Sequence, residues 1–484
     1  MLFRSGAVPE LLAAWQFLLA AGHFWRNHYA ACEPAHPRTA ILIPAWNEAA
    51  VIGASIDRLM ALEYPRDRLR IFLVDDASTD ETPQVARAKA AQYAGNVVHL
   101  RRAKGGEGKA HTLNHGLDVI LRDDWMEALL ITDADVIFEP DSLRKMTRHL
   151  ADPRVGAVTA YIKEGSRPGN YLTRFISYEY ITAQAAARRG QNVLGAIACL
   201  AGGAQLHSRA NLVALGSRID TSSLAEDTFT TFETQVRGRQ VVFEPHATCW
   251  AEEPDSIGGL WKQRLRWARG NVQVTLRYRK LWFRPHRGHR LGSVTFGTVW
   301  FCLFLQPLFM ITSSVSLLAL YLADVPYAWT TFRLLWIINA ATYIFITGFA
   351  LLIDPPTARR VWRQGLMFPG AVNLAIIGYA CFPRLFHDIL RKLFVVTHLP
   401  LQAHEGWIVV FIYAWLSVSM AVAYLAKTAE PHRLGRFISA VLVYIAGYGS
   451  LLCACTFAAY VKELQGAEMK WDKTEKTGKV SIPT

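Results

Sequence analysis

Hydrophobic and polar positions divide the chain into two regions of different character. Residues 38–290 combine short apolar runs with many charged residues, as a soluble domain does, whereas most of the long apolar runs fall in roughly the last 200 residues. A chain of 484 residues exceeds the size at which a single hydrophobic core usually stops growing, so at least two structural units are expected.

The first region alternates short apolar runs with a helical pattern. Strand candidates start at Thr39 and lie within residues 70–80, 96–100 and 127–137, and residues 50–62 have helical spacing. Strands that alternate with helices favour an α/β unit with a largely parallel sheet. We therefore predict this fold class for the first region.

Polar residues follow three of these strands at the point where each strand ends. They are Asn47 with Glu48, Asp75 with Asp76, and Asp133 with Asp135. Open α/β sheets bind their ligands at the carboxyl ends of the strands. Acidic residues that only end strands and cap helices are the alternative, but three such ends together favour a nucleotide site.

Long uncharged runs fill the second region. They cover residues 291–323, 334–353, 364–383, 406–426 and 437–461. A bilayer core of about 30 Å takes roughly 20 helical residues to cross, so four or five spans are expected. The run at 364–383 contains Pro369 and Gly370 and leads into the amphipathic sequence PRLFHDILRKLF, which predicts an interfacial or re-entrant element there. The side of the membrane on which the basic tail ends stays open.

The apolar part of the N-terminal segment is short. Residues 11–25 are short for a full span, so a marginal transmembrane helix and an interfacial helix both remain open. One Arg, an apolar run interrupted by Glu10 and the lack of a small-residue cleavage site argue against a cleavable signal peptide.

Charge and cysteine content narrow the class of protein. The net charge is +13, but the basic residues form no single stripe, and many of them flank apolar segments as they do in cytoplasmic loops. A membrane protein is therefore favoured over a nucleic-acid-binding protein. The seven cysteines include no CxxC pair, which argues against zinc and disulfides and fits reduced thiols in a cytosol-facing protein.

The sequence DAD at 133–135 follows the apolar run ALLIT. Two carboxylates two residues apart at a strand end supply oxygen ligands for a hard divalent cation, which in turn bridges the phosphates of a nucleotide. Such a string is weak evidence when it stands alone, but its place after a strand strengthens it.

The sequence GGEGKAHTLNHGL at 105–117 is neither a P-loop nor a HExxH zinc motif. Ala110 stands where a P-loop needs Ser or Thr, and no Glu follows His111. The favoured interpretation is a Gly-rich turn that lets Lys109 approach a diphosphate, with Asn114 near the start of a helix. A solvated loop lysine is the alternative.

The sequence AEDTF at 225–229 supplies a candidate base. In sugar transfer a carboxylate must accept the proton of the attacking hydroxyl as the new bond forms, and Asp227 is suited to that task. A helix N-terminus capped by Ser222 or Ser223 is the alternative.

The sequence QRLRW at 263–267 places Gln263, Arg266 and Trp267 on one face of a helix. A guanidinium forks onto phosphate oxygens, so Arg266 suits the charge of a departing diphosphate, and the indole of Trp267 suits a stacked sugar. An interfacial helix with Trp261 and Trp267 at the membrane surface explains the same spacing equally well.

Seven strings appear in order along the chain: IPAWNE, VDDASTD, GKAHTLNHGL, TDADV, GGAQ, AED and LWKQRLRWARG. Together they resemble the processive family 2 glycosyltransferases of membranes, which include the cellulose, chitin, hyaluronan and poly-N-acetylglucosamine synthases. The Q-x-x-R-W string with an upstream Glu-Asp pair is specific for that group. LWKQRLRWARG looks most like the poly-N-acetylglucosamine synthases, and the resemblance is close over residues 38–290.

The resemblance implies an α/β GT-A domain with a mostly parallel sheet, combined with transmembrane and interfacial helices. It implies inverting transfer of N-acetylglucosamine or glucose from a UDP-sugar to a growing β-linked polysaccharide, with Mg²⁺ or Mn²⁺ and without an organic cofactor. The implied setting is a bacterial-type inner membrane with a cytosolic catalytic domain. The polymer would leave through the chain's own helices, with accessory export subunits as further partners and no role for nucleic acid.

The resemblance also implies the organisation of the chain. The expected parts are an N-terminal transmembrane or interfacial helix (1–37), a GT-A domain (38–258), an amphipathic segment that carries QRLRW (259–290), a channel region (291–461) and a basic cytosolic tail (462–484).

Each implied role falls on a residue that matches a family motif. The implied catalytic residues are Asp227 as general base and Arg266; the nucleotide-sugar contacts are Ala45, Glu48, Asp75, Asp76, Lys109, Asp133, Gln263 and Arg266; the metal ligands are Asp133 and Asp135; and the acceptor contacts are Gly202, Gly203, Glu226 and Trp267.

Two departures from the family pattern concern the acceptor. Ala225 replaces the usual Thr before Glu-Asp, and AGGAQ lacks the Cys or Ser often found in the acceptor-site string. A membrane transferase that adds one sugar to a lipid or other acceptor therefore remains an alternative. A catalytically silent receptor or scaffold that keeps the fold is a third hypothesis, against which the intact acidic set argues.

Overall fold

The protein is described by a computed structural model over residues 2–25, 28–396, 401–432, 434–469, 478 and 480–481. The chain divides into two compact units, and each unit is built from three segments. The unit that we call the sheet unit comprises Leu18–Asp255, Arg269–Gly297 and Glu468–Thr484. The helical unit comprises Met1–Phe17, Ser256–Ala268 and Thr298–Ala467.

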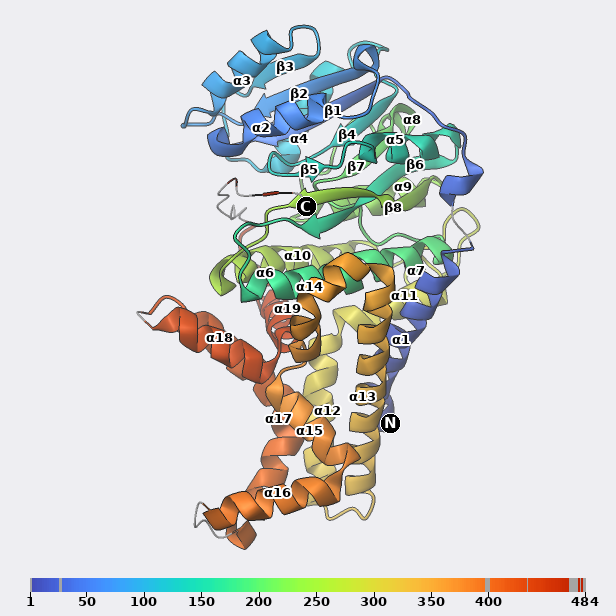
Figure 1. Ribbon diagram of the computed structural model, residues 1–484. Helices are drawn as coiled ribbons and strands as arrows, with labels where there is room; N and C mark the ends of the chain where they lie inside the picture. The colour runs from blue at the N-terminus through green and yellow to red at the C-terminus, as the bar shows by residue number, and fades with distance from the viewer. Residues whose placement is uncertain are drawn as a thin grey trace. The chain divides into compact units, whose positions relative to one another are not determined.

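An eight-stranded sheet forms the centre of the sheet unit (Figure 1). Its strands are β1 (Thr39–Ala45), β2 (Leu69–Asp75), β3 (Val97–Arg101), β4 (Ala128–Ile131), β5 (Ile137–Phe138), β6 (Val155–Glu164), β7 (Gln205–Ser208) and β8 (Gln240–Ala251). Their order across the sheet is β3-β2-β1-β4-β7-β6-β8-β5. Strands β3, β2, β1 and β4 run parallel to one another, so their carboxyl ends meet at one edge.

The other half of the sheet is mixed. β7 pairs antiparallel with both β4 and β6, and β5 pairs antiparallel with β8, whereas β6 and β8 are parallel. The predicted, mostly parallel α/β sheet is confirmed. The strand expected within residues 127–137 is β4, which ends at Ile131 just before the loop that carries DAD, and the same run also contains the short strand β5.

Helices connect and cover the strands of the sheet unit. They are α2 (Ala49–Met60), α3 (Thr82–Gln92), α4 (Lys109–Ile120), α5 (Ser142–Arg148), α6 (Tyr171–Tyr180), α7 (Ala187–Leu194), α8 (Arg209–Ala214) and α9 (Glu226–Val236). α4 lies close against β1 because Gly116 has no side chain, and a Cβ there would collide with Leu42. Leu113 and Leu117 of α4 join Leu42 in a buried cluster, which fixes the N-terminal end of α4 at the sheet edge.

The helical unit is built from apolar helices. They are most of α11 (Val294–Phe304), with α12 (Gln306–Leu322), α13 (Ala328–Ile353), α14 (Pro355–Met367), α15 (Ala371–Cys381), α16 (Pro383–Val396), α17 (Leu401–Ala429), α18 (Gly435–Ala446) and α19 (Tyr448–Leu464). Helices α1 (Leu2–Gly22) and α10 (Ile257–Arg277) contribute residues to both units. The amphipathic sequence PRLFHDILRKLF forms α16, a helix distinct from α15.

Length and composition identify the helices that could cross a membrane. Among the described residues, α13 and Gly406–Ala429 of α17 meet both criteria alone. Three helix pairs meet them together but are bent: α11 with α12 by 68°, α14 with α15 by 72°, and α18 with α19 by 98°. The described chain therefore offers two spans, or up to five if each bent pair is one span. The apolar part of α1, Leu11–Gly22, is shorter.

The bends correct the sequence-based picture of continuous apolar runs. The runs at 291–323 and 437–461 are each split into two helices, at Leu305 and at Gly447. Gly447 has φ +94°, a conformation that side-chain-bearing residues rarely adopt. The break expected at Pro369 and Gly370 is present between α14 and α15, where Gly370 has φ +92°.

Candidate active site

The carboxyl ends of β1 and β2 are tied together by hydrogen bonds. The amide of Asp76 donates to the carbonyl of Ala45 (2.8 Å), and the amide of Asn47 donates to the hydroxyl of Ser78 (2.9 Å). Asn47 has φ +54°, which an Asn side chain tolerates better than most. The amide of Glu48, in turn, donates to Thr82 (2.8 Å). The predicted uridine-contacting residues therefore share one rigid loop pair at the sheet edge.

The two neighbouring carboxylates of β2 have different surroundings. Asp75 is fully buried and accepts a hydrogen bond from the amide of Ser78 (2.8 Å), so it shapes the turn that follows β2. Asp76 accepts from the amide of Gly106 (3.0 Å) and forms an ion pair with Arg102. These bonds join the ends of β2 and β3 to the Gly-rich turn that precedes α4.

Arg102 is a site residue that the sequence analysis did not identify. It follows β3 directly, and its guanidinium pairs with both Asp76 and Glu107. Burial by itself lowers the pKa of Arg102, but the hydrogen bonds that it donates to the two carboxylates raise its pKa overall. Its position at the end of a fourth parallel strand is the signal that could have indicated it.

Lys109 begins α4, and its ammonium lies among three polar groups. Its Nζ donates to the carbonyl of Gly202 (3.0 Å), lies 2.5 Å from Oδ1 of Asp133 and lies 3.7 Å from Oε1 of Glu226. The side chain of Lys109 is only 8% exposed, so the alternative of a solvated loop lysine is wrong. Burial by itself lowers the pKa of Lys109, but the surrounding carboxylates, Asp133 first, raise it overall.

Gly202 and Gly203 complete this cluster from the loop that precedes β7. A Cβ on Gly202 would lie 3.1 Å from Oδ2 of Asp227 and 3.5 Å from Nζ of Lys109. A Cβ on Gly203 would lie 3.3 Å from Oδ2 of Asp133 and would collide with Val136 at 2.8 Å. The absence of side chains at these two positions lets the backbone pass close to the charged groups.

Glu226 and Asp227 form the first turn of α9. Glu226 is buried, whereas Asp227 is partly exposed and accepts a hydrogen bond from the amide of Thr228 (2.7 Å). The N-cap of α9 is Ala225, so neither Ser222 nor Ser223 occupies the capping position that the alternative required. Carboxylates in the first turn of a helix are favoured by its macrodipole.

Two further side chains interact with Asp227 or its neighbour Thr228, and the sequence analysis did not identify them. The Cys199 thiol accepts a hydrogen bond from Thr228 (3.2 Å), and burial, followed by the charge of Asp227, raises its pKa, so it remains a neutral thiol. Arg188 of α7 interacts electrostatically with Asp227, although burial lowers the pKa of its guanidinium. Neither residue belongs to a recognisable motif, so the sequence carried no signal for them.

The DAD loop is held in place from α2. The hydroxyl of Ser55 donates to the carbonyl of Ala134 (2.5 Å), between the two acidic residues. The side chain of Asp133 is 39% exposed, whereas Asp135 is buried. The loop therefore presents one accessible carboxylate and one sheltered carboxylate, and the metal role of this pair stays a prediction.

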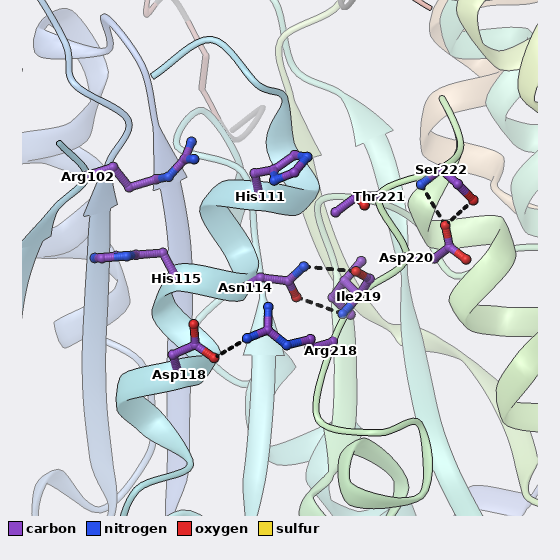
Figure 2. Close-up of a pocket in the computed structure, with 10 residues that line it drawn as sticks. All are labelled: Arg102, His111, Asn114, His115, Asp118, Arg218, Ile219, Asp220, Thr221 and Ser222. Carbon is purple, nitrogen blue, oxygen red and sulfur yellow. Dashed lines mark hydrogen bonds and ion pairs between the residues drawn. The ribbon is translucent and has the colours of Figure 1, made fainter. Parts of the chain in front are cut away.

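A polar pocket lies between α4 and the loop at residues 218–222 (Figure 2). It has a volume of about 590 Å³ and is lined by Arg102, His111, Asn114, His115, Asp118, Arg218, Ile219, Asp220, Thr221 and Ser222. Asn114 exchanges two hydrogen bonds with the backbone of Ile219 (2.8 and 2.9 Å) and so ties α4 to the opposite wall. The residues that line it, as described, include none of the predicted site residues.

The QRLRW sequence lies in α10, in the part of that helix that belongs to the helical unit. Gln263 is buried and accepts a hydrogen bond from Arg264 (2.5 Å), and the guanidinium of Arg264 lies 4.2 Å from the ring centre of Trp267. Arg266 and Trp267 are both partly exposed.

The predicted site residues thus fall into three groups. Ala45, Glu48, Asp75 and Asp76 lie at or just after the carboxyl ends of β1 and β2. The sheet unit brings Lys109 and Asp133 together with Gly202, Gly203, Glu226 and Asp227, although these residues come from four separate parts of the chain. Gln263, Arg266 and Trp267 belong to the helical unit, and their approach to the acidic cluster stays a prediction.

Comparisons with known proteins agree with this arrangement. Residues 36–270 match the family described as glycosyltransferase like family 2. Probable glycosyltransferase YdaM of Bacillus subtilis (strain 168) is 32% identical over 253 residues, which are 52% of this chain and 59% of that protein. Poly-beta-1,6-N-acetyl-D-glucosamine synthase of Staphylococcus aureus (strain COL) is 30% identical over 237 residues, which are 49% of this chain and 55% of that protein. The chain therefore spans little more than half the length of these relatives.

A solved structure shares the fold. The mannosyltransferase PcManGT from Pyrobaculum calidifontis, in complex with GDP-Man and Mn²⁺, aligns with 78% of this chain and 99% of its own, with a TM-score of 0.51 and 24% identity. Together with the family match and the acidic cluster at the sheet edge, this likeness identifies the GT-A fold. Residues 36–270 of this chain form a glycosyltransferase family 2 domain.

Proposed function

We propose that the protein transfers a sugar, N-acetylglucosamine or glucose, from a UDP-sugar to a growing β-linked polysaccharide with inversion of the anomeric carbon. The observation that carries this proposal is the convergence of Lys109, Asp133, Gly202 and Asp227 in the sheet unit. A base, a buried cation and an accessible carboxylate within one cluster are the parts that such a transfer requires.

Asp227 is the proposed general base. As the acceptor oxygen bonds to the anomeric carbon, its proton passes to the carboxylate of Asp227, and the bond between that carbon and the diphosphate oxygen breaks. The nucleoside diphosphate leaves with the bonding electrons. Asp227 suits this role because it is partly exposed and lies beside the side-chain-free Gly202, where an acceptor has room to approach.

Lys109 is the proposed partner of the donor's phosphates. Its charge is retained by the carboxylates around it, and a buried ammonium stabilises negative charge more strongly than one in water. We propose that Ala45, Glu48 and Asp76 hold the uridine at the adjoining loop pair. Arg266 would supply a second cation to the leaving group, and Trp267 would stack on the acceptor sugar.

A divalent cation is part of the proposal. Asp133 and Asp135 supply the hard oxygen ligands that Mg²⁺ and Mn²⁺ prefer. The cluster holds three carboxylates, those of Asp133, Glu226 and Asp227, against the ammonium of Lys109 and the guanidinium of Arg188, and the remaining negative charge fits a further cation. When bound, the cation would neutralise charge on the donor diphosphate.

We further propose that the product leaves through the chain's own apolar helices in a bacterial-type inner membrane. The sheet unit would lie in the cytosol, and accessory export subunits would be further partners. The two to five candidate spans support this proposal. A hydrophilic polymer needs a protein-lined path across lipid, since the hydrocarbon core satisfies none of its hydrogen bonds.

A donor screen on the purified full chain in detergent tests the activity. Release of the nucleoside diphosphate is measured with UDP-N-acetylglucosamine, UDP-glucose and GDP-mannose, with Mg²⁺, with Mn²⁺ and after EDTA. We expect turnover with one UDP-sugar that requires the cation, and a loss of about 100-fold to 10,000-fold in Asp227→Asn. Equal release by the wild type and Asp227→Asn would indicate a silent scaffold.

The product distinguishes a polymerase from a single-sugar transferase. Mass spectrometry and digestion with linkage-specific glycosidases should reveal a ladder of β-linked oligomers. Products that carry a single added sugar, on a lipid or other acceptor, would refute processive synthesis and retain the transferase.

A further inference from the structure

Two histidines and a cysteine of the sheet unit lie close together, and none of them is among the proposed catalytic residues. His28 begins a short 3₁₀ turn (His28–Ala31) that is followed directly by Cys32, and His149 follows α5. Nδ1 of His28 lies 2.8 Å from Nδ1 of His149, although 121 residues separate them, and Sγ of Cys32 lies 3.5 Å from the same Nδ1 of His28. All three ligand atoms lie within 4.8 Å of one another.

The outer nitrogen of each imidazole is held by a carboxylate. Nε2 of His149 lies 2.7 Å from Oε2 of the fully buried Glu244, and Nε2 of His28 lies 3.2 Å from Oδ2 of Asp152. An ionised carboxylate only accepts hydrogen bonds, so each outer nitrogen must carry the proton. In neutral imidazoles, both inner Nδ1 atoms then present lone pairs to one another. Two lone pairs at 2.8 Å repel unless a cation lies between them.

A proton shared by the two imidazoles would also relieve this repulsion, but it would not involve the neighbouring thiol of Cys32. Cys32 is buried, and its sulfur lies 3.5 Å from Nδ1 and 3.8 Å from Nε2 of His28. Two imidazole nitrogens and one sulfur are the ligands that Zn²⁺ prefers, and ligating histidines in proteins usually donate their other ring N–H to a carboxylate or carbonyl. Glu244 and Asp152 supply that second support.

Two of the three ligand separations agree with this ion after small side-chain adjustments, and the third, between Sγ of Cys32 and the His149 nitrogen, lies within 4.8 Å. With Zn–N of about 2.0–2.1 Å and Zn–S of about 2.3 Å at tetrahedral angles, ligand atoms lie roughly 3.3–3.6 Å apart. The separation of 3.5 Å between Cys32 Sγ and His28 Nδ1 already agrees. The two nitrogens at 2.8 Å would have to move apart by about half an ångström, which rotation of the partly exposed His28 ring allows.

We propose that His28, Cys32 and His149 form a structural Zn²⁺ site, with water at the fourth position. Binding displaces the thiol proton of Cys32 to solvent. The segment that carries His28 and Cys32 connects α1 to β1 and already contacts Arg148, whose Nε donates to the carbonyl of Cys32 (2.5 Å). Zinc would fasten this connecting segment to the end of α5. The lack of CxxC pairs, which argued against zinc in the sequence, concerned only ligands close in sequence.

Metal analysis of the full chain tests the site. The protein is purified in detergent without chelators, washed with excess Mg²⁺ and analysed for zinc by mass spectrometry. We expect about one zinc per chain in the wild type and less than one fifth of that in Cys32→Ser and in His28→Ala. His246→Ala and Cys381→Ser are matched controls, because His246 bonds to the same Glu244 and Cys381 is a thiol remote from the cluster in sequence. Both controls should keep the zinc.

A second measurement separates this site from the acidic cluster. Asp135→Asn should retain the zinc, and Co²⁺ in place of zinc should give a thiolate charge-transfer band that disappears in Cys32→Ser and persists in Cys381→Ser. A wild type that neither contains zinc nor takes up one equivalent from solution would overturn the proposal. Zinc content in Cys32→Ser and His28→Ala equal to that of the wild type would do the same.

Discussion

The backbones of Gly370 and Gly447 meet at the point where two apolar helix pairs of the helical unit are broken. A Cβ on Gly370 would collide with the amide nitrogen of Gly447, and a Cβ on Gly447 would collide with the carbonyl of Pro369. The amide of Tyr448 donates to the carbonyl of Phe368 (3.0 Å) across the same contact. One broken helix pair therefore supplies hydrogen bonds that the other needs, as membrane proteins require of any interrupted helix.

Gly447→Ala is predicted to destabilise the protein. The added methyl group must fit a positive φ and also displace the backbone near Pro369, which we expect to cost about 1–3 kcal/mol. The thermal midpoint in detergent should fall by several degrees. Gly449→Ala is the control, because its Cβ would meet only Phe368 at an ordinary 3.5 Å, and its midpoint should not change. Equal midpoints for both variants would contradict the close approach.

Lys109→Met is predicted to lower kcat/KM for the sugar donor by about 100-fold, since a buried charge that stabilises a leaving group contributes several kcal/mol. Lys104→Met is the matched control, because Lys104 is 81% exposed and pairs only with Glu107 among the described contacts. Steady-state release of the nucleoside diphosphate measures both. A Lys109→Met enzyme with wild-type kinetics would show that this ammonium only neutralises Asp133.

The charge of Lys109 predicts a particular pH dependence. Its folded-state pKa is raised, so the stability it contributes is fully present below the unfolded value of about 10.4 and is lost only as the pH rises through the folded value. Lys109 should therefore stay charged between pH 6 and 9. No ionisation in the wild-type pH–rate profile over that range should be abolished by Lys109→Arg. A basic limb below pH 9 that disappears in Lys109→Arg would be inconsistent with the raised pKa.

Gly202→Ala is predicted to lower kcat by at least about 10-fold with little loss of thermal stability. Its methyl group would lie 3.1 Å from Oδ2 of Asp227 and would press on the proposed base while leaving the core intact. Gly203→Ala should also lower the thermal midpoint, because its methyl group collides with buried Val136. Measuring kcat and the midpoint together distinguishes the two, and identical effects in both variants would argue against this assignment.

Arg266→Ala and Trp267→Ala separate the two interpretations of QRLRW. If the motif serves catalysis, Arg266→Ala should lower kcat by about 100-fold and Trp267→Ala should raise the KM for an acceptor oligosaccharide. If it is only an interfacial helix, both variants should weaken recovery in membranes and leave the kinetics of the remaining enzyme unchanged. Kinetic constants per mole of folded protein decide between these outcomes.

The sequence alone determined the half of the fold whose strands all run parallel to one another. β1, β2, β3 and β4 are parallel strands joined by helices, so the polar residues that follow them necessarily meet at one edge. Asp76 and Asp133 could be placed there from hydrophobic periodicity. Family motifs then gave a role to Asp227, which periodicity by itself could not.

Only the tertiary structure decided which distant residues touch. The antiparallel strand β7 brings Gly202 to Lys109 and Gly203 to Asp133. Arg102 pairs with Asp76 directly after β3, and His149 reaches His28, 121 positions away in the sequence. The splits at Leu305 and Gly447 were equally hidden within uniformly apolar runs. Composition and periodicity indicate which residues of a segment are buried and which face water. They do not indicate which distant segment packs against it, because that depends on long-range pairing and backbone contacts.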